Sequence, residues 1–442
     1  MSTLIKKGTI VTSSKTYIAD IRVKGEHIIE IGSLTPDMNE TVIDATGKLV
    51  FPGIIDPHVH FHMNVGNIFT ADDFENGSKL ALANGITTVI DFAAYQSTLG
   101  VIKSIDKRIQ DAKSSYIDYK FHLEVTSINQ VKQIDMDEVR RLGIKSFKIY
   151  TTYGSDMIPM EDIEPLFILA KDNDITVMVH AEKDQILKEA KEKLIKEGMI
   201  STSFHPHSRP RDAEISMITY VIKLAEKIGT KIYIAHISTS EGVALLKGTN
   251  DNIMGETCPH YLLLDDSSYH NSDAAKYIMS PPLRKKEDNI ALFKGVLDST
   301  IACLSTDHCA FTEETKLNSN TFYETYSGVA GCETLLPLMY TLFIKEDKSL
   351  NKLVEVMSTN AAKIFGMYPK KGTIETGSLA DIVIYDPNFV STINRNNLQT
   401  NANYTVFEGF PIKGKVETTI SKGNVLYQFG RYSLNQRGKY IK

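Results

Sequence analysis

Hydrophobic residues of this chain recur in short runs, and most of these runs are followed by a stretch with helical spacing. The runs occupy residues 49–60, 87–93, 119–126, 144–150, 175–182, 231–238, 253–262 and 301–309. Their near-continuous apolar character is typical of strands in a parallel sheet that is covered on both faces. Amphipathic stretches such as 160–173 and 214–229 fill the gaps between them. Eight such units predict an α/β fold, a (β/α)8 TIM-like barrel of roughly 250 residues.

The two ends of the chain follow a different pattern. Runs rich in Ile, Val and Thr are separated by glycines in the first fifty residues, and the same texture returns near the C-terminus in KKGTIETGSLADIVIYDP and VETTISKGNVLYQFG. This pattern predicts β-strands joined by turns. We expect one small β-sandwich domain built from residues 1–52 and 369–442, and a barrel formed by residues 53–368.

Composition and charge exclude several classes of protein. The chain has 442 residues, and 49 Lys and Arg against 54 Asp and Glu give a net charge of −5. This balance does not support binding to nucleic acid or to an anionic membrane through overall charge. No apolar run approaches the ~20 residues that span a bilayer, and the N-terminus lacks the features of a signal peptide. Because four scattered cysteines are too few for a disulfide framework, we expect a cytoplasmic protein.

Polar residues stand where several of the predicted barrel strands end. They are His58 and His60 after the first run, Lys148 in the fourth, His180 in the fifth, His236 in the sixth and Asp307 in the eighth. The C-terminal ends of the strands form the active-site face of such a barrel. Residues that alternate along a strand point to the same side, so His58 and His60 are placed to chelate one ion. Nitrogen and oxygen donors of this kind suit Zn2+, or less often Mn2+, Co2+ or Fe2+. The alternative interpretation is a pair of hydrogen-bonded histidines at a strand end.

Lys148 lies in the apolar run SFKIY, where burial disfavours a charged ammonium. Its amine therefore either reaches the rim as an ammonium, acts as a Schiff-base nucleophile, or adds CO2 to become a carbamate that can bridge two metal ions. Among the other histidines, His62 is expected in a loop and His122 in the core. His205 and His207 are expected at the surface, and His308 is a candidate for substrate contact.

These residues, in this order, resemble the amidohydrolase superfamily, and more closely its dihydropyrimidinase/D-hydantoinase family. The similarity runs over essentially the whole chain. It is carried by VFPGIIDPHVHFHM, SFKIYTTY, VMVHAE, YIAHIS, GETCPHYL, KYIMSPPLR and STDHCAF. A single HxH motif is weak support for a family, but the ordered set is specific.

The resemblance implies a site with two divalent metal ions, most commonly Zn2+. One ion would be held by His58, His60 and Asp307 and the other by His180 and His236, with Lys148 as the bridging N6-carboxylysine. A hydroxide between the ions would be the nucleophile, and Asp307 would act as the proton acceptor. The resemblance also implies substrate contacts, from Tyr153 to the developing oxyanion, from Ser280 and Ser327 to the imide edge chiefly through the main chain, and from Met63, Val65 and Tyr150 to the exocyclic substituent.

The implied reaction is the opening of a cyclic amide, a 5,6-dihydropyrimidine or a 5-substituted hydantoin, to an N-carbamoyl amino acid. Ser327 precedes Gly328 where the family usually has Asn-Gly, and the SGVAGCET and CPHYL segments are also similar to allantoinase, which is one alternative. Dihydroorotase is disfavoured because His62 stands where it usually has an arginine. An alternative of another class is a non-catalytic interaction protein with the same fold. The family implies a homo-oligomer, a tetramer or a dimer.

Overall fold

The computed structural model describes residues 2–132 and 136–442 of the chain. Within this part, a parallel sheet of eight strands confirms the predicted barrel, and each predicted run contributes one strand to it. In chain order the strands are β6 (Ile54–Asp56), β9 (Ile86–Ala93), β10 (Asp118–Glu124), β11 (Ser146–Tyr150), β12 (Thr176–His180), β13 (Ile232–Ile234), β14 (Ile253–Thr257) and β15 (Cys303–Leu304). Beyond the two outer strands, a parallel bridge joins Val59 to His308, and the amide of His60 donates to the carbonyl of His308 at 2.8 Å. This contact closes the barrel.

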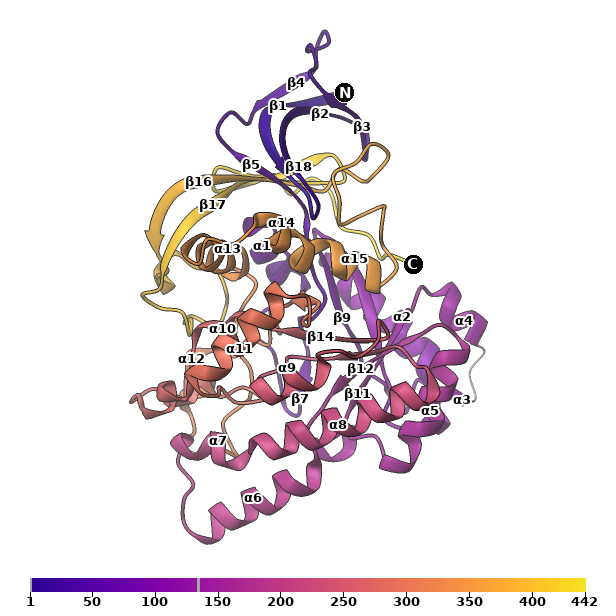
Figure 1. Cartoon of the computed structure of the whole chain (residues 1–442), viewed down its shortest axis with the longest axis vertical. Coiled ribbons are helices and arrows are strands. Elements are labelled where there is room, and N and C mark those ends of the chain that lie inside the picture. The colour runs from indigo at the N-terminus through magenta and orange to yellow at the C-terminus, as the bar shows by residue number, and fades with distance from the viewer. Residues whose placement is uncertain (1, 133–135) are drawn as a thin grey trace.

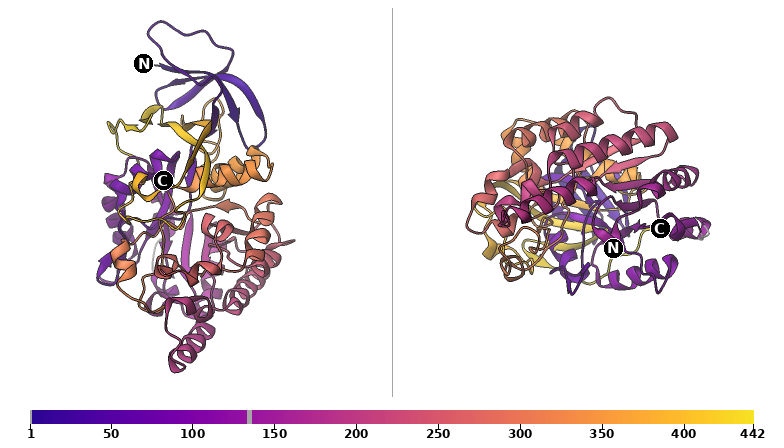
Figure 2. Two further views of the ribbon diagram at one scale, coloured as in Figure 1. Left: turned by 90° about the vertical axis from the view of Figure 1, so that its left-hand side faces the viewer. Right: turned by 90° about the horizontal axis from the view of Figure 1, so that it is seen from below.

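Helices surround the barrel strands, as the view from below shows (Figure 2). They are α1 (Phe74–Ala83), α2 (Val101–Asp111), α3 (Ile128–Lys132), α4 (Met136–Arg141), α5 (Met160–Asp172), α6 (Asp184–Lys196), α7 (His205–Ser208), α8 (Arg211–Ile228), α9 (Ser240–Leu246), α10 (Pro259–Leu263), α11 (Lys286–Leu297), α12 (Glu313–Leu317), α13 (Leu335–Lys345), α14 (Leu350–Val354) and α15 (Asn360–Ile364). The predicted helix over 214–229 ends at Gly229, whose φ of 85° is the left-handed conformation that glycine adopts without strain. Among the described residues, no helix combines the length and apolar character that a membrane crossing requires.

A second, mixed sheet is built from both ends of the chain, as predicted, and lies at one end of the molecule (Figure 1). Its strands are β1 (Ser2–Val11), β2 (Thr16–Lys24), β3 (His27–Gly32), β4 (Thr41–Asp44), β5 (Leu49–Pro52), β16 (Ile382–Thr392), β17 (Pro411–Ser421), β18 (Asn424–Gln428) and β19 (Arg431–Tyr432). Strand β5 pairs with β1 on one side and with β16 on the other, and so joins the two termini. This sheet has a separate apolar core that includes Ile10, Val50 and Ile382.

The first apolar run, 49–60, divides between the two sheets. Its first part is β5 of the terminal sheet and its second part is β6 of the barrel. Gly53 separates them at a point where a Cβ atom would lie 2.1 Å from Oγ1 of Thr87 and 2.9 Å from Cβ of Asp381. Only glycine fits this close crossing of chain segments. The domain boundaries at residues 52 and 369 remain predictions.

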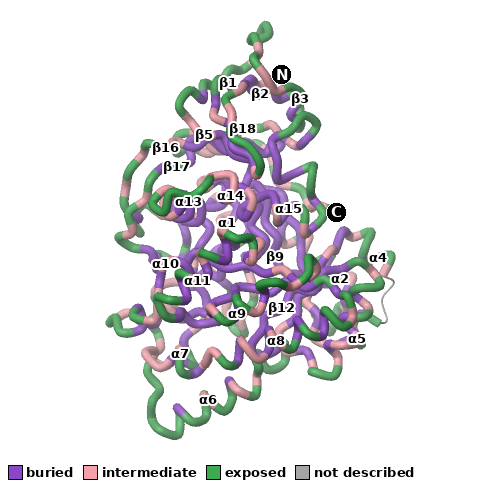
Figure 3. The backbone as a smooth tube through the Cα atoms, in the orientation of Figure 1, coloured by how far each residue is buried: buried purple, intermediate pink, exposed green. Residues whose placement is uncertain are grey.

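Buried residues concentrate in the barrel strands and at the junction with the terminal sheet, whereas α6 is largely exposed (Figure 3). The strands β9 and β12 are buried over their whole length. A strand that is buried on both faces reads as a continuous apolar run, which is why these elements could be predicted. Polar residues within the barrel strands, such as Asp91 in β9 and His122 in β10, are buried as well.

Candidate active site

Three side chains converge where β6 and β15 lead into the rim. Nε2 of His58 lies 3.2 Å from Nε2 of His60 and 3.2 Å from Oδ1 of Asp307, and Nε2 of His60 lies 3.3 Å from the same oxygen. Tetrahedral zinc with bonds of about 2.0–2.1 Å sets neighbouring ligand atoms roughly 3.3 Å apart. The spacing of these three atoms therefore fits a metal ion.

A buried carboxylate fixes the orientation of His58. Nδ1 of His58 lies 2.5 Å from Oε1 of Glu256, whose other oxygen accepts a hydrogen bond from Tyr233 at 2.8 Å. With Nδ1 carrying the proton toward Glu256, the lone pair of Nε2 faces His60 and Asp307. A carboxylate behind a ligating histidine sets the tautomer and raises its basicity. Burial raises the pKa of Glu256 to about 7, and the ammonium of Lys148 and the hydroxyl of Tyr233 act against this rise.

The second histidine pair has the same design. Nδ1 of His180 lies 2.9 Å from Nε2 of His236, and Nε2 of His180 lies 2.7 Å from Oε2 of Glu182. Arg209 donates from Nε to Glu182 at 3.1 Å and forms an ion pair with it. Burial opposes the negative charge of Glu182, but Arg209 and His180 outweigh it and hold its pKa far below the usual value. Glu182 is therefore an anion that directs the lone pair of His180 Nδ1 toward His236.

The pKa values of the ligand candidates favour the forms that bind metal. Burial lowers the pKa of His58, His180 and His236, so each imidazole is neutral at pH 7. Burial also opposes the charge of Asp307, but His58 and His60 act more strongly together and hold its pKa well below the ordinary value. Neutral imidazoles and a carboxylate anion are the states that coordinate a divalent cation.

Lys148 lies between the two histidine pairs. Its Nζ is 4.8 Å from the ring centre of Phe92 and 4.9 Å from that of Tyr150. Phe92 stacks on His60 at 4.5 Å, and the Tyr150 ring lies 6.0 Å from that of His180. Burial lowers the pKa of Lys148 to about 8, so a substantial fraction of its amine is neutral near pH 7–8. The choice among the three states of Lys148 considered from the sequence remains a prediction.

Three residues of the site adopt left-handed backbone conformations. The φ angles of His236, Asp307 and Tyr153 are 36°, 48° and 81°. Such angles cost residues other than glycine roughly 1–3 kcal/mol each and cluster at functional sites. They follow from the short strands here, since β13 and β15 end before His236 and Asp307 and the chain turns at these residues.

Three of the predicted substrate residues, Tyr153, Ser280 and Ser327, lie close together, because Tyr153 interacts with Ser280 and Ser280 contacts Ser327. The Tyr153 ring lies 4.8 Å from that of His180, and its hydroxyl accepts a hydrogen bond from Arg209 at 3.3 Å. Oγ of Ser280 and Oγ of Ser327 lie 2.9 Å apart, although the two residues come from different loops. The structure thus brings together the pair that was expected to bind one edge of the ring.

The three residues expected near an exocyclic substituent are less closely associated. Tyr150 ends β11, and its hydroxyl donates to Oε1 of Glu124 at 3.0 Å. Met63 and Val65 lie at the hairpin of β7 (Asn64–Val65) and β8 (Ile68–Phe69). The hydroxyl of Thr70 accepts the amide of Met63 at 2.9 Å and donates to the carbonyl of His60 at 2.9 Å, which ties the start of the hairpin to the first histidine pair.

The expected surface position of His205 was wrong. His205 is buried, and its Nε2 donates to the carbonyl of Met279 at 2.7 Å. The segment rich in Pro and Arg forms the short helix α7 here, and its first residue faces inward and supports the chain next to Ser280. His122 is buried in β10 as expected, between Ser146 and the carbonyl of Pro57.

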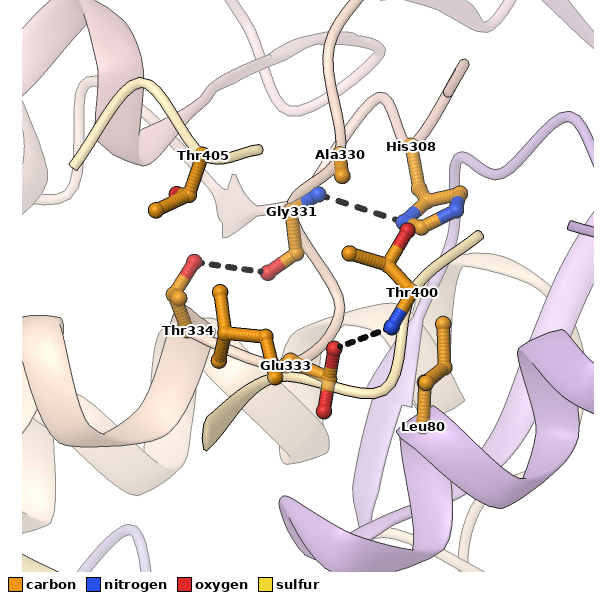
Figure 4. A pocket seen from close by; sticks show the side chains of 9 residues that line it. Leu80, His308, Ala330, Gly331, Glu333, Thr334, Thr400 and Thr405 are labelled. Carbon is orange, nitrogen blue, oxygen red and sulfur yellow. Dashed lines mark hydrogen bonds between the residues drawn. The ribbon is translucent and has the colours of Figure 1, made fainter. Parts of the chain in front are cut away.

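His308 lines a small pocket together with Gly331, Glu333 and Thr400 (Figure 4). Its Nδ1 accepts the amide of Gly331 at 3.1 Å, and its Nε2 lies 3.1 Å from Oδ2 of Asp72. Glu333 in the same pocket accepts the amide of Thr400 at 2.9 Å. Both ring nitrogens of His308 are therefore engaged, which leaves it a structural role rather than the substrate contact considered from the sequence.

Glu256, Glu182 and Arg209 were missed by sequence reasoning. Both glutamates stand in motifs that were recognised, GETCPHYL and VMVHAE. Glu182 lies two positions after His180, just beyond the end of β12, and this spacing places two side chains on one side of an extended chain. The contact of Glu256 with His58 joins residues 198 positions apart and has no local signal.

A barrel that gathers four histidines, an aspartate and a lysine at the C-terminal ends of its strands defines a class, the metal-dependent barrel hydrolases. The sequence model of the Amidohydrolase family matches residues 49–426, and the chain belongs to this metal-dependent family. It is 32% identical to a D-hydantoinase of Geobacillus stearothermophilus, over 100% of this chain and 96% of that enzyme. It is 31% identical to a D-phenylhydantoinase of Escherichia coli, over 100% and 98% of the two chains.

A solved structure supports the same relationship. The crystal structure of a dihydropyrimidinase from Brevibacillus agri superposes with a TM-score of 0.95 at 32% identity, covering 100% of this chain and 98% of that one. The resemblance inferred from the motifs is therefore confirmed.

We predict that Glu256→Gln weakens metal binding about tenfold or more, because the less basic amide no longer polarises His58. Competition with a chelator of known affinity measures the effect. Glu417→Gln, which removes another buried carboxylate from β17, is the matched control and should bind metal as the wild type does. Equal metal affinity in all three proteins would contradict the assigned role of Glu256.

Proposed function

We propose that this chain hydrolyses a cyclic amide, a 5-substituted hydantoin or a 5,6-dihydropyrimidine, to the N-carbamoyl amino acid. The observation that carries the proposal is the approach of the two histidine pairs, in which the ring centres of His58 and His236 lie 5.5 Å apart. Asp307 lies beside the first pair, and Lys148 interacts electrostatically with Asp307, His58 and His236. The full-length similarity to hydantoinases and a dihydropyrimidinase supports this choice of substrate over allantoin. The filled set of ligand candidates disfavours a non-catalytic interaction protein.

We assign the ligand candidates to two ions, for which zinc is our proposal. His58, His60 and Asp307 would hold one ion, and His180 and His236 the other, with Lys148 as a carbamate between them. When bound, the ions would lower the pKa of a water molecule and polarise the scissile carbonyl. The lowered pKa of Lys148, due chiefly to burial, supplies the neutral amine that CO2 requires.

Proton transfer falls to Asp307 in this proposal. Its pKa lies below the ordinary value, so it is an anion at neutral pH, and the anion is the form that can accept the proton of the attacking water. It would then hand that proton to the leaving ring nitrogen, as a general acid. Its left-handed backbone directs the carboxylate to the place where His58 and His60 meet.

Tyr153 supplies the oxyanion contact. Burial raises the pKa of its phenol well above the ordinary value, and although Arg209 acts against this rise, the hydroxyl remains protonated and able to donate. The main chain at Ser280 and Ser327 would bind the imide edge of the ring, so the serine at 327 in place of asparagine is tolerated. Met63, Val65 and Tyr150 are proposed to surround the exocyclic substituent.

The proposal extends to the assembly and its location. By analogy with the family, we propose a homo-oligomer, a tetramer or a dimer, in the cytoplasm. Light scattering of the purified protein tests the assembly.

A substrate panel tests the proposed function directly. Dihydrouracil, several 5-substituted hydantoins and allantoin are incubated with zinc-loaded protein, and ring opening is followed by product formation. We expect turnover of a hydantoin or of dihydrouracil and little or none of allantoin. Failure to open any ring by protein of full metal content would overturn the proposal, and preferred turnover of allantoin would replace the substrate class.

Lys148→Ala should remove the bridging ligand that the two metal positions share. We expect the metal content to fall and the turnover rate to fall by more than a hundredfold. Mass spectrometry of the native protein should show one added CO2, and formate or acetate should restore part of the lost activity. Lys120→Ala removes another buried lysine of the barrel and is the control. Wild-type turnover and metal content in Lys148→Ala would exclude the carbamate.

Tyr153→Phe should lower kcat about 10²–10³-fold, the usual effect of removing one oxyanion donor, and leave metal content unchanged. The hydrogen bond forms mainly in the transition state, so KM should change little. Tyr323→Phe, at a partly exposed tyrosine of the surface, is the control. A kcat within threefold of the wild-type value would remove Tyr153 from the mechanism.

A further inference from the structure

Lys316 is a fully buried lysine that the proposed mechanism does not use. It lies in α12, and its side chain is 0% exposed. Its Nζ donates to three main-chain carbonyls, those of Ile278 at 2.6 Å, Tyr326 at 2.7 Å and Gly328 at 3.1 Å. An ammonium has three hydrogens, so each of its donors is matched by one carbonyl.

The three carbonyls belong to the two loops that carry Ser280 and Ser327. Ile278 precedes Ser280 by two positions, and Tyr326 and Gly328 flank Ser327. The amide of Gly328 also donates to the carbonyl of Ile278 at 3.0 Å. Lys316 thus sits at the crossing of the two segments and ties them together.

The loop that carries Ser327 also contacts the chain that follows Asp307. The amide of Cys309 donates to the carbonyl of Val329 at 3.0 Å. A Cβ on Gly328 would lie 2.4 Å from the carbonyl oxygen of Cys309, so the loop is in close contact here. The position of Ser327 relative to Asp307 therefore depends on how firmly the loop is held from the side of Lys316.

Burial of the Lys316 ammonium costs desolvation free energy, which an apolar side chain at this position would avoid. In the part of the chain that the structure describes, the hydrogen-bond partners of the Lys316 ammonium are the three carbonyls, and no carboxylate forms an ion pair with it. Burial without a counter-ion lowers the pKa of Lys316. Carbonyl dipoles alone stabilise the charge, and a Leu or Met of similar volume would avoid the desolvation cost.

We propose that Lys316 is a positioning residue for substrate binding, whose ammonium sets the spacing between the main chain at 278–280 and at 326–328. This inference rests on the proposed function, because it assigns the two segments to the imide edge of the ring. Lys316 acts on ring binding rather than on bond breaking, because it contacts neither Asp307 nor the histidines.

The test compares Lys316→Met with the wild type, using the ring that the panel identifies. We expect KM to rise at least tenfold while kcat stays within threefold and metal content is unchanged, the pattern of lost uniform binding. Hydrogen–deuterium exchange should show faster exchange of the amides in 278–280 and 326–329, including that of Gly328. This second measurement needs no substrate.

Lys120→Met is the matched control. Lys120 is also a buried lysine, 2% exposed, and it donates to the carbonyls of Gly143 at 2.5 Å and Ile441 at 3.4 Å. Its removal costs a similar set of interactions on β10, away from the two loops. We expect lower stability but an unchanged KM and unchanged exchange in the two segments.

Several outcomes would overturn the proposal. They are an unchanged KM and unchanged exchange in folded Lys316→Met, a loss confined to kcat, or an equal rise of KM in Lys120→Met. Should Lys316→Met not fold, Lys316→Arg takes its place, because a planar guanidinium keeps donors but cannot reproduce the geometry of the ammonium. A wild-type KM in Lys316→Arg would then count against the proposal. If the wild type opens no ring, the proposed function fails, whereas the exchange experiment still decides whether Lys316 holds the loops.

Discussion

Two buried carboxylates determine what the rim of this barrel can do. Glu256 and Glu182 each hold one nitrogen of a histidine, and each thereby aims the other nitrogen at a second histidine. Without these contacts, an imidazole has two tautomers and a rotatable ring, and the lone pairs need not converge. The two carboxylates also differ in pKa. Arg209 keeps Glu182 ionised, whereas burial raises the pKa of Glu256 to about 7. A metal ion bound at His58 would lower the pKa of Glu256 and favour its ionised form.

The rim is held in a strained but well-supported geometry. The left-handed residues His236 and Asp307 would be unfavourable in a free loop. Several hydrogen bonds from neighbouring side chains hold the backbone around them. His308, next to Asp307, accepts the amides of Gly331 and Cys332, and the chain after β6 is bound by Arg108, which donates to the carbonyls of Phe61 and Phe92. The hydrogen bonds of His308 and Arg108 thus offset the backbone strain at the candidate ligands.

The fold could be predicted from the sequence because barrel strands buried on both faces are continuous apolar runs. The strand-end positions of His58, Lys148 and His180 followed from the same pattern, since a strand boundary is a local property. The structure brings these side chains together, although their ligand roles remain predictions. Contacts across the barrel had no such signal. Glu256 was missed because its partner is remote in the chain, and His205 was misplaced because its polar segment forms a short helix whose first residue faces inward to bind the carbonyl of Met279.

Cations near the rim hold the main chain, whereas Asp307 and the histidines face the reacting centre. Among the described residues, the buried ammonium of Lys316 donates only to main-chain carbonyls, and the partly buried guanidinium of Arg108 donates to carbonyls and also pairs with Asp91. A carbonyl that is bound by a buried cation cannot turn easily, because rotation would leave the charge unpaired in an apolar environment. Such loops can be rigid even without regular secondary structure. The identity of residue 327 then matters less than the position of its backbone, which explains how a serine can occupy a place where relatives of this kind usually carry asparagine.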